Sequence, residues 1–336
     1  MKISIGSKII EGPWGGGNLF VINLKNYLIS NGHEVVHHLE DDDIDIILMT
    51  SPNHKAESSS YGYRDVYKYI KKIKRDSIVV HRINECDERK GTKNVNEFIL
   101  NSNKVADATI FVSSWIESLY LNQGFKSENS RVILSGSDKN IFNQVNQSIW
   151  DKKSQLKIVT HHWGNNWNKG FEIYSKLDNM IYNNEINLDV KFTYIGNVPK
   201  NFKFKKTTLL SPLSGVDLAK KLKNNHIYLT ASLFEPSGNH HIEGAQCGLP
   251  VLFINSGGLP EYCNGYGVMF DNGDFINKLE YLTENYEKYL NKVREYPRNS
   301  ETMSKDYLDY FEELLNNKNQ IIEKRNKIKL KRFIKI

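Results

Sequence analysis

Cysteine, proline and long apolar runs are all scarce in this chain of 336 residues, which has three cysteines and eight prolines. Cys86, Cys247 and Cys263 lie far apart without CxxC spacing, so the sequence supports neither a disulfide framework nor a zinc ribbon. This cysteine usage predicts a reducing, cytoplasmic location. No apolar run reaches the roughly 18 residues of a membrane-spanning helix. Residues 1–6 also lack the apolar region of a secretory signal.

The formal net charge of +6 is concentrated at one end of the chain. Between residues 317 and 336, eight basic residues stand against one acid, so this segment carries +7 and residues 1–316 carry −1. A nearly neutral body, whose aromatics are not clustered with lysines, argues against a nucleic-acid partner. The basic tail is interleaved with apolar residues, and we hypothesise that it contacts an anionic membrane surface. A solvated, frayed terminus is the alternative.

Short apolar segments alternate with helical patterns along the chain, which predicts an α/β fold with parallel sheets. The pattern stops over the polar stretch 143–155 and then restarts. We therefore predict two Rossmann-like units facing a central cleft, because ligands of such units bind beyond the carboxyl ends of the strands. The predicted divisions are residues 1–150, residues 151–300, a helix at 301–316 that packs across both units, and the basic tail 317–336.

One metal-binding motif is rejected on geometry. Residues 33–37 have the HExxH spacing of a helical zinc site. The Asn31-Gly32 turn before it and the Val35-Val36 pair within it favour a strand instead. In a strand, positions four apart are separated by about 13 Å, which zinc–nitrogen bonds of about 2 Å cannot span. The histidine pairs at 161–162 and 240–241 lack a third ligand at suitable spacing, so no metal site is predicted.

The most informative segment runs from Ser232 to Pro250, between two predicted strands. Glu235 precedes a Pro-Ser-Gly turn, and Glu243 lies about one turn into the helix that follows. Gly238 allows a ligand to approach the backbone, and the amides at residues 239–241 form a partly positive helix end that suits a diphosphate. The two carboxylates are suited to accept hydrogen bonds from sugar and ribose hydroxyls.

These motifs resemble those of family-4 glycosyltransferases with the GT-B fold. The resemblance rests on E-x7-E from Glu235 to Glu243, C-G-x-P-V at 247–251 and G-G-x-P-E at 257–261, in that order. It covers about residues 1–316. It implies a GT-B fold and the transfer of a hexosyl-type sugar from a nucleotide-diphosphate donor to an acceptor hydroxyl, with retention of anomeric configuration. It implies no bound metal and no cofactor beyond the nucleotide sugar as co-substrate.

The resemblance also implies roles for individual residues. Glu235 is predicted as a catalytic residue that would contact hydroxyls of the donor sugar, Glu243 would bind the nucleotide ribose, and Lys169 would neutralise the diphosphate. Glu261 would support the donor pocket or be purely structural. The predicted donor-binding residues are Lys169, Gly238, Asn239, His240, Glu243, Glu261 and Asn165.

The sequence departs from the family beside the diphosphate. Family members carry an arginine five residues before the lysine, where this chain has Gly164. His162 or Asn165 is available to donate to the phosphate, but neither supplies the fixed positive charge of arginine. Diphosphate binding is therefore the part of the assignment that the sequence supports least.

The acceptor side is predicted in the first unit. The segment from His81 to Asp87 follows a strand at Ile78–Val80, so we expect it at the cleft. His81 is predicted as a catalytic residue near the reacting centre, and Arg82 as an acceptor-side residue. The alternative is a loop held by local hydrogen bonds. Gly15, Gly16 and Gly17 are predicted to form an acceptor-side glycine loop, and a tight strand-to-helix connection is the alternative.

Two other functions stay open. One is a non-catalytic nucleotide-sugar-binding module on the same fold, which the missing arginine makes conceivable. The other is a dinucleotide-dependent oxidoreductase, although neither a G-x-G-x-x-G nor a Walker loop is present. For a transferase, the expected partners are a nucleotide-sugar donor and a glycan, lipid-linked or small-molecule acceptor.

Overall fold

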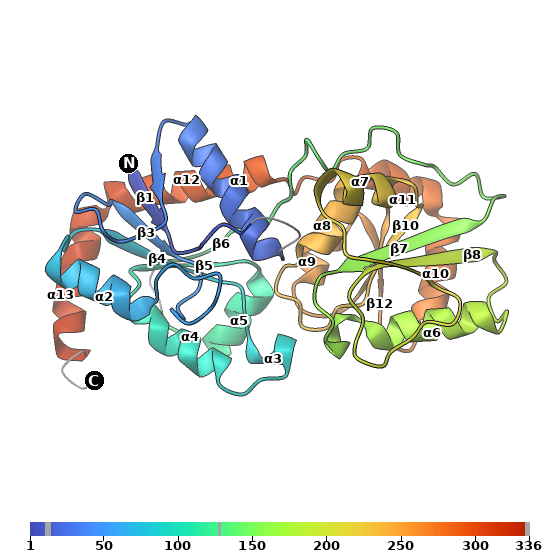
Figure 1. The fold of residues 1–336 in the computed structure, drawn as a ribbon, viewed down its shortest axis with the longest axis horizontal. Helices are drawn as coiled ribbons and strands as arrows, with labels where there is room; N and C mark the ends of the chain where they lie inside the picture. Colours follow the sequence, from blue (N-terminus) through green and yellow to red (C-terminus); the bar gives the residue numbers. More distant parts are fainter. Residues whose placement is uncertain (11–14, 127–128, 333–336) are drawn as a thin grey trace.

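The computed structural model describes residues 1–10, 15–126 and 129–332, with side chains up to residue 327. The chain forms two parallel six-stranded sheets, each covered by helices (Figure 1). The buried strands are rich in isoleucine, valine and leucine, as expected for parallel sheets that are covered on both faces. The predicted α/β architecture with two successive Rossmann-like units is confirmed.

The first sheet has the order β2-β1-β3-β4-β5-β6. Its strands are β1 (Lys2–Ile5), β2 (Glu34–Val36), β3 (Ile46–Met49), β4 (Ile78–Ile83), β5 (Ala108–Phe111) and β6 (Ser130–Val132). The helices between them are α1 (Gly16–Ser30), α2 (Tyr63–Lys72), α3 (Asp87–Lys90), α4 (Val95–Asn103) and α5 (Ser114–Asn122). Because residues 34–36 are a strand, the HExxH pattern does not lie on a helix.

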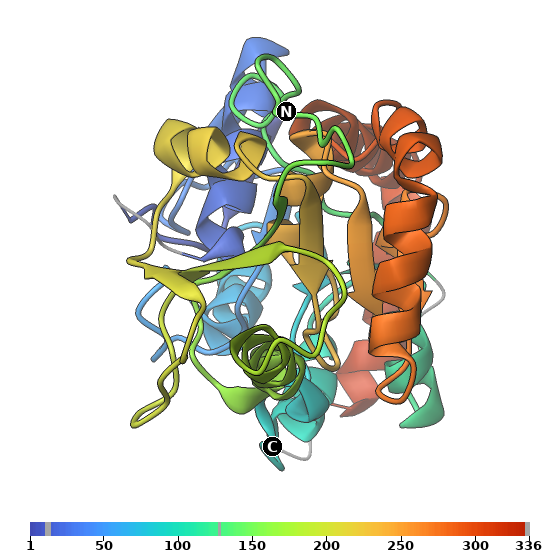
Figure 2. The same ribbon diagram turned by 90° about the vertical axis from the view of Figure 1, so that its right-hand side faces the viewer.

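The second sheet has the order β12-β11-β10-β7-β8-β9, and Figure 2 shows it with helices on both sides. Its strands are β7 (Leu156–His162), β8 (Val190–Gly196), β9 (Thr208–Leu210), β10 (Ile227–Thr230), β11 (Val251–Ile254) and β12 (Gly267–Phe270). Its helices are η1 (Trp167–Lys169), α6 (Phe171–Tyr182), α7 (Gly215–Lys223), α8 (Asn239–Gln246), α9 (Leu259–Cys263), α10 (Phe275–Glu284) and α11 (Tyr286–Val293). Phe142 and Trp150, which precede β7, also pack into the core of this unit.

The last two helices return to the first unit (Figure 1). Along α1 lies α12 (Ser300–Asn316), whose Tyr307 and Phe311 pack in one core cluster with Phe20. From here on, the first unit means the first sheet with α1–α5, α12 and α13 (Lys318–Arg332), and the second unit means the second sheet with η1 and α6–α11.

Residues 318–332 of the basic tail form the helix α13, and Arg325 in it is buried. The alternative of a frayed terminus is therefore wrong for this part of the tail. Membrane contact stays a prediction, which co-sedimentation with anionic vesicles tests. Within the described part of the chain, no helix combines the length and the apolar character needed to cross a membrane. The same residues contain no group of three or more histidine, cysteine, aspartate or glutamate side chains that is placed to hold a metal ion.

Candidate functional site between the two units

The topology of the second sheet brings two predicted site residues together. Its strand order changes direction between the paired strands β7 and β10, and ligands of open parallel sheets bind beyond the strand ends at such a point. The loop after β7 carries Lys169, and the loop after β10 carries Glu235. Gly170 has φ +102°, and a Cβ there would lie 2.8 Å from the carbonyl carbon of Ala231, so glycine allows η1 to lie against the end of β10.

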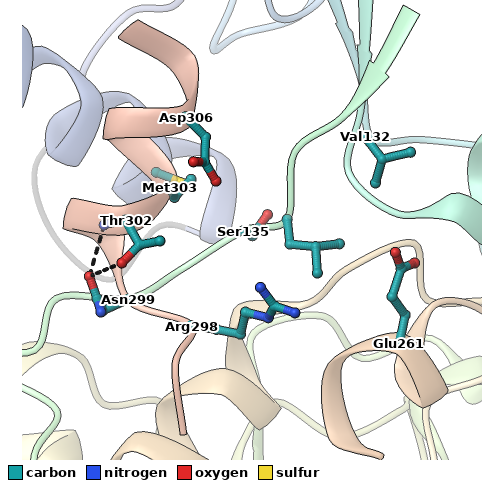
Figure 3. A pocket seen from close by; sticks show the side chains of 9 residues that line it. Val132, Ser135, Glu261, Arg298, Asn299, Thr302, Met303 and Asp306 are labelled. Atoms are coloured by element: carbon teal, nitrogen blue, oxygen red, sulfur yellow. Dashed lines mark hydrogen bonds between the residues drawn. The ribbon is translucent and has the colours of Figure 1, made fainter. Parts of the chain in front are cut away.

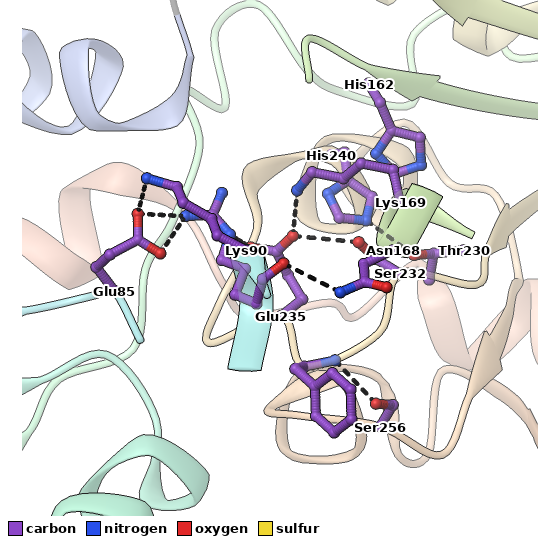
Figure 4. Close-up of polar contacts among 12 residues, drawn as sticks. Glu85, Lys90, His162, Asn168, Lys169, Thr230, Ser232, Glu235, His240 and Ser256 are labelled. Atoms are coloured by element: carbon purple, nitrogen blue, oxygen red, sulfur yellow. Dashed lines mark hydrogen bonds and ion pairs between the residues drawn. The ribbon is translucent and has the colours of Figure 1, made fainter. Parts of the chain in front are cut away.

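Glu235 is a buried carboxylate held by cations from both units (Figure 4). Lys169 Nζ lies 2.5 Å from Glu235 Oε2, and Arg89 Nε lies 3.2 Å from Glu235 Oε1. The Ser232 hydroxyl donates to Oε2 at 3.2 Å. Burial alone would raise the pKa of Glu235, but the charges of Arg89 and Lys169 lower it well below its usual value. Glu235 is therefore ionised at neutral pH.

Further polar contacts join the two units at this cluster. Asn168, next to Lys169, lies 3.4 Å from the carbonyl oxygens of Glu88 and Arg89 and donates to both. Glu85 pairs with Lys90 at 2.5 Å and with Arg89 at 3.3 Å. The short helix α3 thereby lies against the loop that carries Lys169.

The G-G-x-P-E element holds the backbone of Glu235. The amide of Gly258 donates to the Glu235 carbonyl at 2.8 Å. Gly257 has φ +62°, and a Cβ there would lie 2.6 Å from the Glu235 nitrogen. A side chain at residue 257 would therefore displace the backbone that carries the carboxylate.

Glu261, in contrast, is turned to the first unit. Its carboxylate accepts hydrogen bonds from the amide and the hydroxyl of Ser114, at 2.7 and 2.8 Å, at the start of α5. It also lines a hollow of about 290 Å³ between the units, together with Ser135, Arg298 and Asp306 (Figure 3). These contacts favour the structural alternative for Glu261 over a part in the donor pocket.

Four buried histidines extend from the Glu235 cluster to Glu243. His161 Nε2 lies 2.8 Å from Glu243 Oε2. His240, in the first turn of α8, has its ring centroid 4.5 Å from that of His162 and 4.9 Å from that of His241. The predicted residues Lys169, Glu235, His240 and Glu243 are thus joined in one buried polar group around the start of α8.

The buried histidines predict a loss of stability at acid pH. Burial lowers the pKa of His241 to about 3 and that of His81 to about 4, whereas histidine in an unfolded chain titrates near 6.5. Because the unfolded chain then binds more protons, the free energy of unfolding falls as pH drops below about 6.5. The expected loss is about 2 kcal/mol per fully buried histidine by pH 5.

Urea denaturation at pH 7.5 and pH 5.0 measures this dependence. His241→Phe should reduce this dependence by the share of one histidine, and neither ring nitrogen of His241 has a hydrogen-bond partner within the described structure that the substitution would leave unpaired. The control His54→Gln, at an exposed position, should leave the dependence as it is in the unmodified protein. Equal pH dependence in all three proteins would contradict the prediction.

Part of the predicted acceptor side lies close to the donor side. A Cβ on Gly16 would lie 3.0 Å from Cγ of Asn239, and one on Gly15 would lie 3.9 Å from the Trp163 ring, whereas Gly17 has open space around it. The start of α1 therefore lies opposite the start of α8. Both helix ends present backbone amides between the two units.

The structure corrects the predicted positions of His81 and Arg82. Strand β4 continues to Ile83, so both residues lie within the strand instead of after it. His81 is 1% exposed, and its Nδ1 forms a hydrogen bond of 2.8 Å with Asn103 of α4. Arg82 is buried with its guanidinium 4.0 Å from the ring centroid of Phe20. Neither residue contacts the Glu235 cluster within the described structure, so the catalytic role of His81 stays a prediction without a supporting contact.

Asn165 and His162 are the candidates to donate to the phosphate in place of the missing arginine. Asn165 is exposed, next to Gly164 on the loop before Lys169, and has no hydrogen bond within the described residues. His162 is buried and hydrogen-bonded to the Tyr174 hydroxyl at 2.8 Å. No hydrogen bond within the described residues joins either of them to Lys169, and their part in phosphate binding stays a prediction.

Arg89 is the site residue that the sequence analysis missed. It lies in a helix of four residues, Asp-Glu-Arg-Lys, which is too short to show apolar periodicity. A signal was nevertheless present: acids precede bases, and Gly91 follows with φ +64°. That order complements the helix dipole and ends in a typical C-terminal glycine.

No family model and no curated protein matches the chain. Solved structures do. A glycosyltransferase from Rickettsia africae aligns with a TM-score of 0.68 and 15% identity, over 94% of this chain and 98% of that one. A sucrose-phosphate synthase from Thermosynechococcus elongatus aligns with a TM-score of 0.65 and 15% identity, over 94% of this chain and 99% of that one. HepE from Anabaena, solved with UDP and glucose, aligns with a TM-score of 0.65 and 12% identity, over 92% of this chain and 98% of that one. At these identities the similarity establishes the fold, which is of the GT-B type.

Proposed function

We propose that this protein is a metal-independent, retaining glycosyltransferase that moves a hexosyl-type sugar from a nucleotide-diphosphate donor to an acceptor hydroxyl. The observation that carries the proposal is the buried, ionised Glu235 beside Lys169 at the strand-order reversal of a GT-B fold. The structural neighbours are glycosyltransferases, and HepE was solved with UDP and glucose. Their similarity supports this class of donor for the present chain.

The transfer exchanges one bond of the sugar for another. The bond from the anomeric carbon to the diphosphate oxygen breaks, and a bond from the same carbon to the acceptor oxygen forms on the same face. The acceptor proton passes to the departing phosphate oxygen. Negative charge therefore grows on the diphosphate, where Lys169 and the free amides at the start of α8 stabilise it. This arrangement supports a reaction without a bound metal.

The two glutamates have separate parts in this proposal. Glu235 accepts hydrogen bonds from the donor sugar, because it lies before the start of α8 and beside Lys169. Glu243 accepts hydrogen bonds from the ribose and is oriented by His161. The acceptor is proposed to be a glycan, a lipid-linked sugar or a small molecule, reached from the side of Gly15 and Gly16. We place this activity in the cytoplasm, a proposal supported by three cysteines that are all unpaired.

A thermal-shift screen with UDP, GDP, ADP and their sugar conjugates tests the proposal. One diphosphate should raise the melting temperature, since a ligand at 100 times its dissociation constant adds about 2.7 kcal/mol of stability. Its sugar conjugate should then be transferred or slowly hydrolysed. If calorimetry shows donor binding without transfer or hydrolysis, the non-catalytic binding module is correct instead. If no nucleotide binds, neither function holds.

A further inference from the structure

Arg89 of the first unit lies against the proposed donor site of the second unit. Its Nε is 3.2 Å from Glu235 Oε1, and its side chain is 26% exposed, so it is accessible from one side. The charge of Glu235 is the main cause that raises the pKa of Arg89. Arg89 is therefore a permanent positive charge next to the carboxylate that Lys169 also contacts.

The charges of this cluster do not balance. Three cations, Lys169, Arg89 and Lys90, surround two carboxylates, Glu235 and Glu85. One positive charge therefore lies partly out of water without a matching carboxylate in the cluster. An anionic ligand would supply the missing charge, and the two phosphate groups of a nucleotide sugar carry negative charge next to the sugar that Glu235 would contact.

The second unit has no guanidinium of its own at this place. Gly164 lies beside Lys169, since a Cβ on residue 164 would be 3.4 Å from Lys169 Cε. The loop before Lys169 has glycine, not arginine, at residue 164. The ion pair of Arg89 with Glu235 places an arginine of the first unit next to this loop.

The position of Arg89 is tied to the loop of Lys169. Asn168 donates to the carbonyl oxygens of Glu88 and Arg89, and Glu85 holds the guanidinium from its other side at 3.3 Å. Moving the first unit away from the second would remove Arg89 and leave Lys169 in place. Binding through both cations therefore requires the two units to be together.

From these contacts, and resting on the proposed function, we propose that Arg89 binds the diphosphate of the donor together with Lys169. In the absence of donor, Glu235 accepts a hydrogen bond from Lys169 and forms an ion pair with Arg89. When the donor is bound, the guanidinium of Arg89 donates to its phosphate oxygens instead of pairing with Glu235. Glu235 Oε1 is then free to accept a hydrogen bond from the sugar. The donor site is thus built by both units and is complete only when they are in contact.

Calorimetry on full-length Arg89→Ala with UDP, GDP and ADP, and with the matching nucleosides, tests this. Loss of a hydrogen bond to a charged group should weaken binding of the preferred diphosphate about 10- to 100-fold. Binding of the nucleoside should stay within about twofold, because a nucleoside carries no phosphate. Lys93→Ala, which removes a positive charge from an exposed side chain three residues after α3 and outside the cluster, is the control and should change little. Circular dichroism and the melting temperature check that each variant is folded.

A rescue variant makes the test sharper. Gly164 does not have a positive φ, so Arg89→Ala combined with Gly164→Arg places a guanidinium near Lys169 from within the second unit. We expect this double variant to recover at least about fivefold in diphosphate affinity. Equal diphosphate affinity in the unmodified protein and in Arg89→Ala would overturn the role of Arg89 and leave the proposed function intact. If the unmodified protein binds no nucleoside diphosphate, both proposals fail.

Discussion

Replacing Lys169 by methionine is expected to lower sugar transfer by about 100- to 1,000-fold. Methionine keeps most of the length of the buried side chain and removes the ammonium group 2.5 Å from Glu235. The leaving diphosphate then loses a cation that is already in place before the reaction, and a preorganised group of this kind contributes on that scale. The effect should appear in kcat as well as in KM, because negative charge on the diphosphate grows in the transition state.

The measurement is steady-state transfer with the donor found in the thermal-shift screen. Lys176→Met, at an exposed position on α6, is the control and should transfer at the rate of the unmodified protein. Because Lys169→Met also leaves a buried carboxylate with one cation fewer, it should be destabilised. Adding Glu235→Gln removes that charge and should restore stability without restoring transfer. Intact transfer in both Lys169→Met and Glu243→Ala would show that the roles are assigned to the wrong residues.

That Lys169 and Glu235 lie close together could be predicted, because the loops that follow parallel strands all leave the sheet at the same edge. Each residue follows a strand with a clear apolar pattern, and the carboxyl ends of β7 and β10 lie at one edge of one sheet. Short motifs on those loops therefore come together without any information on side-chain packing. Glu243 was placed one turn into α8 by its distance from the turn that ends at Gly238.

The sequence could not place Arg89 or His81, and it left two roles open for Glu261, since their positions depend on partners from distant segments. Arg89 reaches a carboxylate 146 positions along the chain, across the boundary between the units. His81 looked like a loop residue because it is polar, but Asn103 provides a partner inside the first unit and the strand continues. Glu261 belongs to a motif of the donor side, yet it accepts hydrogen bonds from Ser114 of the first unit. A local pattern shows none of these pairs.

The contacts of the basic tail with the first unit also could not be predicted from its local sequence pattern. Its alternation of lysines with apolar residues suggested an amphipathic surface segment, but Ile321 and Arg325 are buried against the first unit. Arg325 Nε donates to Asp107 Oδ1 at 2.8 Å, and a second guanidinium nitrogen pairs with the other carboxylate oxygen. Further donors of Arg325 reach the carbonyl oxygens of Arg75 at 2.6 Å and Ser77 at 2.5 Å. One basic residue of the tail is therefore a structural element of the body.

Arg325→Met is accordingly expected to lower the free energy of unfolding by about 3–5 kcal/mol, measured by urea denaturation at neutral pH. The reason is that the carboxylate of Asp107, only 2% exposed, would lose its cation and stay buried, and removing one partner of a buried ion pair costs about that much. Lys327→Met, which breaks an exposed pair with Glu323 on the same helix, should cost at most about 1 kcal/mol. Equal unfolding midpoints for the two variants would mean that the Arg325–Asp107 pair does not hold α13 on the first unit. A large difference would show that the Arg325–Asp107 pair stabilises the fold, so that vesicle binding is better tested with substitutions of exposed tail lysines than with a deletion that removes Arg325.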